Sequence, residues 1–233
     1  LPALCVLLVL ALASCRTAPE TTREVQVVDE SAIEELEEVE LLLVGYRTTQ
    51  DPGLVAQAEA RLDELEAVER RNRRYDARLV ALRAELALLR GDDAVAARLA
   101  AEALDRWAED ELALLVQARL VTDAAARLEA LDDAISRADT TFRLRAERGV
   151  ALLELGKPGD AVVALDAALA ELPDPYQTLY GPLRERAWTL RESESIAAES
   201  AAYLNDEALS FIGMTVLAQA ESSLLDFITA GRV

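Results

Sequence analysis

The two cysteines, Cys5 and Cys15, are the side chains with the most distinctive chemistry in this chain. A thiol becomes a nucleophile when a neighbouring base makes it a thiolate, yet the 233 residues include no histidine. The common Cys-His and Ser-His-Asp arrangements are therefore excluded. A disulfide is not expected either, because Cys5 lies inside the apolar run LPALCVLLVLAL, where a folded domain would not present it for pairing.

Cys15 ends a segment with the layout of an export signal. About a dozen apolar residues are followed by small residues and then, from Arg16, by a polar stretch. The apolar run is shorter than the roughly 20 residues that span a bilayer. We therefore expect residues 1–14 to be a signal segment and not an anchor helix.

The stretch Leu12-Ala13-Ser14-Cys15 resembles the lipobox of bacterial lipoproteins. This resemblance implies cleavage before Cys15 and a diacylglycerol on its thiol, with the body tethered to a membrane of the cell envelope and facing the periplasm or exterior. Acyl chains contribute about 0.8 kcal/mol per buried CH₂, so two or more of them anchor stably. No basic residue precedes Arg16, so the sequence is expected to begin inside the signal. Residues 15–30 read as a flexible linker with a reach of about 20 Å.

No other motif indicates catalysis or a cofactor. Gly156-Lys157 is followed by Pro158, whereas a phosphate-binding loop requires Ser or Thr after the lysine. The many carboxylates are interspersed with basic residues, and no metal-ligand spacing is visible. We expect no enzymatic activity, no cofactor and no metal site.

Composition indicates an all-α protein, and the charge favours a protein partner, a small cationic partner or none. The hydrophobic content is 52% but aromatic residues make up only 4%, so the apolar surface is mostly Ala, Leu and Val, which suit close helix packing. The net charge of −19 disfavours nucleic acid and anionic membrane faces as partners.

Two helices are expected before the most informative region. Ser31 has the position of an N-cap, and the acidic run Glu34–Glu40 after it is interpreted as a solvated helix face. A second helix is expected to end in four arginines, which would complement the helix dipole there: Arg70, Arg71, Arg73 and Arg74.

Residues 77–173 contain an internal repeat. The segments LRGDDAVAARLAAEAL, LVTDAAARLEALDDAI and LELGKPGDAVVALDAAL place Gly91, Thr122 and Gly156 at equivalent breaks, 31 and 34 residues apart. An apolar helix precedes each break and an Ala-rich helix follows it. Each unit is therefore a helical hairpin that must stack on its neighbours to bury its face.

The repeat resembles the tetratricopeptide repeat, a 34-residue helical hairpin with small residues where its helices touch. The third unit matches through Gly149, Gly156, Ala161, Ala168 and Pro173, and the first through Ala84, Gly91, Ala96 and Ala103. The middle unit keeps Leu131 and Ala134, but Leu115 and Arg127 replace small residues. The resemblance implies a right-handed solenoid of antiparallel helix pairs over residues 31–204, and residues 205–233 are expected to form a helical C-terminal cap.

In such arrays the first helix of each unit lines a concave, partner-binding face. Carried over by position, the resemblance places eight residues there: Arg78, Glu85, Leu88, Glu109, Arg119, Arg143, Val150 and Glu154. Arginines on an acidic body suggest a carboxylate-bearing peptide as the ligand.

The sequence thus predicts a membrane-anchored scaffold or adaptor of the cell envelope that binds a protein or peptide partner. Two alternatives remain. One is an accessory small-molecule-binding or chaperone lipoprotein of a binding-protein-dependent uptake system, which a roofed cavity would favour over an open groove. The other is a structural component of envelope or wall assembly.

Replacing Cys15 by Ser tests the anchor. Without an acylated thiol, the body is expected to leave the membrane fraction of the cells that produce it, because no other lipid attachment is predicted. Fractionation followed by a high-salt wash measures this. Sedimentation of Cys15→Ser with the washed membranes would contradict the lipoprotein hypothesis.

Overall fold

The computed structural model describes residues 30–67 and 72–204, and within these ranges helices are the only regular secondary structure. This confirms the all-α class. The elements are α2 (Glu30–Thr49), α3 (Pro52–Glu66), α4 (Arg73–Leu89), α5 (Asp93–Arg106), α6 (Glu111–Arg119), α7 (Ala124–Arg137), α8 (Phe142–Glu154), α9 (Pro158–Leu169) and α10 (Asp174–Leu204).

Short polar side chains fix where several helices begin. Asp51, Asn72, Asp92, Asp110 and Asp123 each precede a helix and accept a hydrogen bond from a backbone N–H of its first turn. These caps occupy donors that have no partner within the helix, so each helix has a defined start.

Two glycines mark the repeated breaks. Gly91 after α4 and Gly156 after α8 have φ angles of 77° and 68°, a left-handed conformation that a side chain disfavours. The equivalent Thr122 lies between α6 and α7. The breaks aligned in the sequence are thus real interhelical turns.

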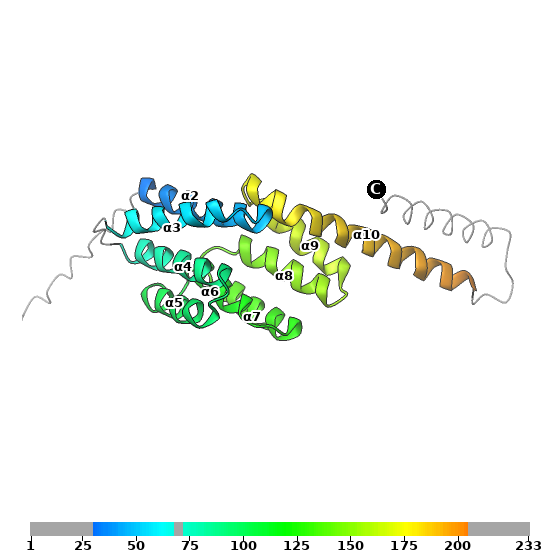
Figure 1. The fold of residues 1–233 in the computed structure, drawn as a ribbon. Helices are drawn as coiled ribbons and strands as arrows, with labels where there is room; N and C mark the ends of the chain where they lie inside the picture. Colours follow the sequence, from blue (N-terminus) through cyan, green and yellow to red (C-terminus); the bar gives the residue numbers. More distant parts are fainter. Residues whose placement is uncertain (1–29, 68–71, 205–233) are drawn as a thin grey trace, which may run out of the picture.

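Consecutive helices pack against each other in pairs, as Figure 1 shows for α4 with α5, α6 with α7 and α8 with α9. The second helix of each pair also packs on the first helix of the next, since α5 contacts α6, α7 contacts α8 and α9 contacts α10. Small residues permit these contacts. Ala96, Ala103, Ala161 and Ala168 are fully buried, as the sequence predicts for four of the small repeat positions.

Helix α2, which precedes the repeats in the sequence, contacts helices at both ends of the described chain. It packs on α3, α4 and α10, and the beginning of α10 lies beside it (Figure 1). Its buried side includes Leu36, Val39 and Leu43, which join α4 and α6 in one hydrophobic core. Together α2 and α10 therefore cover the face formed by the first helices of the pairs.

Helix α10 runs on beyond the body (Figure 1). Its 31 residues are one helix that includes Pro182. Among its residues up to 196, the last buried position is Ala187, and residues 188–196 are all exposed or half-buried. The expected C-terminal cap (205–233), the signal segment (1–14) and the linker up to residue 29, with Cys15, lie outside the described residues. Within residues 30–67 and 72–204, no helix combines the length and apolar character needed to cross a membrane.

Two expectations for the first helices are wrong. Glu40 does not belong to a solvated face, because it is only 4% exposed and is paired with arginines of other helices. Arg73 and Arg74 lie in the first turn of α4, not at the end of the preceding helix, because the Asn72 side chain caps α4 at this point. Arg70 and Arg71 lie outside the described residues.

Gly149 provides a test of the close packing of α8 on α9. A Cβ atom there would lie 2.6 Å from Cγ of the buried Leu165, so Gly149→Ala is expected to lower the free energy of unfolding by about 1–2 kcal/mol. The loss should appear although alanine favours a helix interior. Chemical denaturation measures it.

Gly159→Ala in α9 is the matched control. The nearest atom to its added Cβ would be 4.0 Å away, so this variant should keep or slightly raise the stability. Equal destabilisation by both variants would mean that the described contact between α8 and α9 is wrong.

Candidate functional site

Two clusters of charged and tyrosine side chains lie between α2 and the helices that it covers. The first, the Arg143 cluster, consists of Glu40, Arg78, Asp110, Glu111, Arg143 and Tyr176. The second, the Arg119 cluster, consists of Arg47, Glu85, Arg119, Glu147 and Tyr180. The stacked rings of Tyr176 and Tyr180, with centroids 6.2 Å apart, lie between them.

Arg143 joins four helices in the first cluster. Its guanidinium donates to Glu111 Oε2 at 2.7 Å and to Glu40 Oε2 at 3.0 Å, and its Nε donates to the Tyr176 hydroxyl at 3.2 Å. These partners lie in α6, α2 and α10, while Arg143 itself lies in α8. One side chain thus ties the first described helix to the last.

The carboxylates of this cluster also organise the backbone. Glu111 is fully buried and accepts from the backbone N–H of Arg143 at 2.8 Å and from the Thr140 hydroxyl at 2.8 Å. Asp110 caps α6 and accepts from Arg78 Nε at 2.9 Å. Asp110 therefore fixes the start of a helix and pairs with a neighbouring repeat at the same time.

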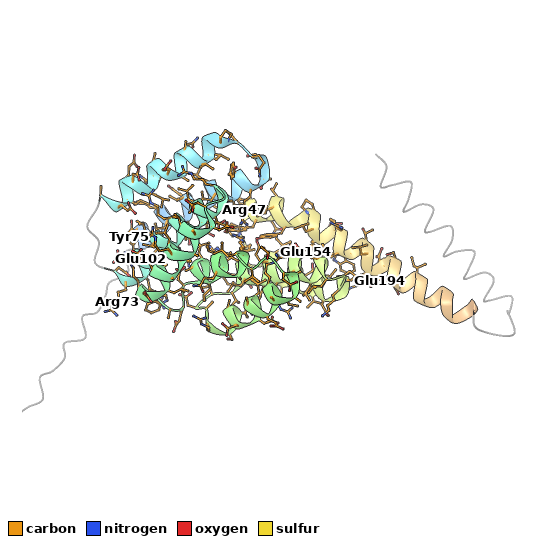
Figure 2. All side chains as sticks on the ribbon, turned by 60° about the horizontal axis from the view of Figure 1, so that its bottom comes forward. Arg47, Arg73, Tyr75, Glu102, Glu154 and Glu194 are labelled. Atoms are coloured by element: carbon orange, nitrogen blue, oxygen red, sulfur yellow. The ribbon has the colours of Figure 1, made fainter. Side chains whose placement is uncertain are left out.

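Arg119 holds the second cluster together. It donates to both oxygens of Glu85 at 2.9 Å and to Glu147 Oε1 from Nε at 3.0 Å. Arg47 of α2 also pairs with these two carboxylates, at 3.1 Å to Glu85 and 3.4 Å to Glu147. Figure 2 shows Arg47 at the inner side of α2, toward the helices that it covers.

Charge pairing controls the ionisation of these groups. Burial alone would raise the pKa of Glu40, but Arg143 and Arg78 outweigh it and hold that pKa below its usual value. Burial acts in the same direction on Glu147, yet Arg119 and Arg47 lower its pKa to about 2. For Tyr176, burial and then the charge of Glu40 raise the pKa well above its usual value. At neutral pH Glu40 and Glu147 are therefore ionised and Tyr176 is protonated.

The arrangement is suited to holding helices together. Every guanidinium in the two clusters already faces at least one carboxylate, so the buried charges are paired. Removing one partner of a buried pair typically costs 3–5 kcal/mol, because it leaves an uncompensated charge. A ligand that recruited one of these arginines would have to break such a pair.

The eight residues predicted for a concave face fall into two groups. Arg78, Glu85, Arg119 and Arg143 meet in the clusters. The other four do not join them. Leu88 packs among the alanines of α4 and α5, and Val150 packs against the α8–α10 core. Glu109 is exposed before α6, and Glu154 pairs with Arg127.

The face itself is largely filled. The space left between α2, α4, α6 and α10, lined by Leu43, Leu115 and Leu179 among others, has a volume of about 10 Å³. That volume accommodates about one water molecule. The face that the sequence predicts as a groove is thus occupied by α2 and the start of α10.

Sequence reasoning missed the partners that complete the clusters, including Glu40, Glu111, Glu147 and Tyr176. One signal was present in the repeat spacing. Glu111 lies 32 residues before Arg143, Arg143 lies 33 residues before Tyr176, and Glu85 lies 34 residues before Arg119. A carboxylate and an arginine separated by the repeat spacing, as in Glu111–Arg143 and Glu85–Arg119, indicate pairing between neighbouring units.

A larger cavity opens at one end of the Arg143 cluster, where α4, α6, α8 and α10 begin. Its volume is about 470 Å³, within the range of ligand sites in proteins. Apolar and aromatic side chains from α2, from the starts of α4, α8 and α10 and from the loops before α6 and α10 line it: Ile33, Leu36, Leu41, Tyr75, Trp107, Phe142, Leu172, Pro173 and Tyr176. Its polar lining includes Glu37, Arg74, Asp139 and Glu171 beside members of the Arg143 cluster.

Comparisons of the chain with protein-family models, with curated proteins and with solved structures gave no match. Among residues 30–67 and 72–204, no group of three or more metal-ligating side chains is arranged to hold a metal ion.

Acid should weaken the Arg119 cluster. The pKa of Glu147 is about 2 in the folded protein and 4.5 ordinarily, so the unfolded chain binds a proton that the folded one does not as the pH falls from about 5 to 2. Its contribution to stability, of order 3 kcal/mol, is present above about pH 5 and is lost across that window.

Denaturation of the wild type and Glu147→Gln at several pH values measures this loss. The variant should be less stable at pH 7, and its free energy of unfolding should fall less steeply between pH 5 and 2, because residue 147 can no longer take up a proton. Identical slopes for the two proteins would contradict the role assigned to Glu147.

Proposed function

We propose that this protein is a lipid-anchored scaffold of the bacterial cell envelope that holds a partner protein through the cavity beside α2. The observation that carries the proposal is this 470 Å³ cavity, with its aromatic and aliphatic lining, next to a repeat face that is otherwise closed. Proteins rarely keep such apolar concavities without a binding role.

A tetratricopeptide-like array supplies the frame in this proposal. The contacts within each pair and between successive pairs support this frame, because stacked antiparallel hairpins would make contacts in the same order. Gly149, Gly156 and the buried alanines have the positions that the repeat requires. Helices α2 and α3 would then be a first, divergent unit whose leading helix closes the inner face.

In this proposal the partner does not bind at the paired arginines that the sequence predicts as its contacts. Arg119 and Glu85 pair with each other under α2, which suits them to fixing the helices. Arg78 and Arg143 also line the cavity, so a partner there would approach the edge of the Arg143 cluster without entering the filled space between the helices. Of the concave face that the sequence predicts, only the end that opens into the cavity is thus proposed to bind the partner.

The predicted lipid anchor at Cys15 and its linker are compatible with a partner held in the cavity. Acylation of Cys15 and a linker of about 15 residues would hold the body within about 20 Å of a lipid surface. Ile33, which lines the cavity, lies in the first turns of α2, close to where the linker would end. A partner held in the cavity would thus be kept close to the membrane.

A small-molecule function is the second candidate, because the cavity volume also suits a compact organic ligand. It corresponds to the accessory lipoprotein of an uptake system. Native mass spectrometry of the full chain purified from its own cells would detect such a ligand as an added mass.

Photocrosslinking in intact cells tests the scaffold proposal. A photoreactive amino acid at Ile33 should crosslink a specific protein, since this residue lines the cavity and is 38% exposed. The same group at Val163, which is 68% exposed on α9 and outside the cavity, is the control. A partner that is captured from Val163 and not from Ile33 would contradict the proposed site, and mass spectrometry identifies the crosslinked segment.

A further inference from the structure

The cavity lining carries more negative than positive charge. The lining contains five carboxylates (Glu37, Glu40, Asp110, Asp139, Glu171) and three guanidiniums (Arg74, Arg78, Arg143), which leaves an excess of two negative charges. The acidic excess agrees with the net charge of −19 on the whole chain.

All three arginines already have partners. Arg78 lies 2.9 Å from Asp110, and Arg143 lies 2.7 Å from Glu111. Arg74 stacks on Trp107, 4.3 Å from the ring centroid, and lies 3.9 Å from Asp139. An anionic ligand would therefore compete with existing carboxylates for every one of them.

Two carboxylates at the rim are available instead. Glu37 of α2 and Glu171 of the loop before α10 are both exposed, and neither forms an ion pair or a side-chain hydrogen bond with another described residue. They lie on elements far apart in sequence that meet at the cavity. A cation near the rim could thus face carboxylates from two sides.

The interior beneath this rim is mostly apolar, beside the paired charges of the Arg143 cluster. Tyr75 and Leu172 are buried, and Trp107 and Phe142 are partly buried and line the space. Such a surface favours an aliphatic or aromatic side chain, whose removal from water supplies about 25 cal/mol for each Å². The site therefore combines an apolar interior with a cation-attracting rim.

We infer that the cavity binds a segment of the partner protein in which an apolar residue is flanked by lysine or arginine. This inference rests on the proposed function and specifies the partner's chemistry. The apolar side chain enters the cavity, and the basic side chain stays at the rim between Glu37 and Glu171. This is the opposite charge from the acidic ligand that the arginines suggest in the sequence.

Selection of random 12-residue peptides on phage, with the full chain purified in detergent as the target, tests this inference. The enriched peptides should contain Lys or Arg next to Leu, Ile, Phe or a similar residue. The best of them should bind about fivefold more weakly to Glu37→Gln/Glu171→Gln, a loss appropriate to two exposed charge pairs. Both residues are exposed, so the double variant is expected to fold.

Glu34→Gln/Glu38→Gln is the matched control. It removes the same charge from exposed positions of α2 that do not line the cavity, so the peptide affinity should be unchanged. Equal weakening in both double variants would show that only the general field of the protein acts, and would overturn the inference.

Two other outcomes distinguish this inference from the function on which it rests. Enrichment of acidic or uncharged peptides, together with a protein crosslinked from Ile33, would leave the scaffold proposal standing and overturn the chemistry inferred for the partner. Crosslinking from Val163 alone would overturn the site itself, whatever peptides are selected.

Discussion

The structure depends on the burial of paired charges between helices that are distant in sequence. Arg143 links α8 to Glu111 of α6, Glu40 of α2 and Tyr176 of α10, and the partner Glu40 lies 103 residues away in the chain. A chain with only 4% aromatic residues packs its helices through small side chains, which allow close contact but specify register weakly. Buried ion pairs impose a geometry that alanine and leucine contacts do not. In this protein they would define how α2 and α10 cross the repeats.

This constraint also changes the surface that a partner can use. Because α2 and the start of α10 cover the inner face, the arginines of the two clusters point inward and are paired with carboxylates. The surface is open instead at the cavity, where the first helices of the pairs begin. The rim of the cavity is acidic, because carboxylates balance the charges of the arginines while Glu37 and Glu171 remain exposed. The side chains that stabilise the fold are therefore distinct from those proposed to meet the partner.

Much of the fold could be predicted from local sequence, because its signals are local. Gly91 and Gly156 specify left-handed turns, and Ala96, Ala103, Ala161 and Ala168 mark the close contacts between helices. The start of α4 was mispredicted because four arginines suggest a helix end, whereas Asn72 among them caps the next helix. Alignment of the repeats could identify Arg78, Arg119 and Arg143, but not Glu40 of α2, which pairs with Arg78 and Arg143.

The covering of the inner face could not be predicted, because it depends on tertiary contacts. Glu40 belongs to an acidic run that has the pattern of a solvated face, and nothing near it in sequence indicates that arginines 38 and 103 residues away would bury it. The cavity is likewise formed by loops and helix ends from five separate parts of the chain. Local periodicity carries no information about such a site.

Amide hydrogen exchange on the wild type and Arg143→Met tests the central role of the Arg143 cluster most directly. The substitution keeps a long side chain but leaves Glu40 and Glu111 without this guanidinium. If the cluster holds α2 across the repeats, the amides of α2 and of the first turns of α10 should exchange faster together, while α5 and α9, which contribute no side chain to the cluster, should keep most of their protection. Unchanged exchange in α2, or equal acceleration in every helix, would contradict the account.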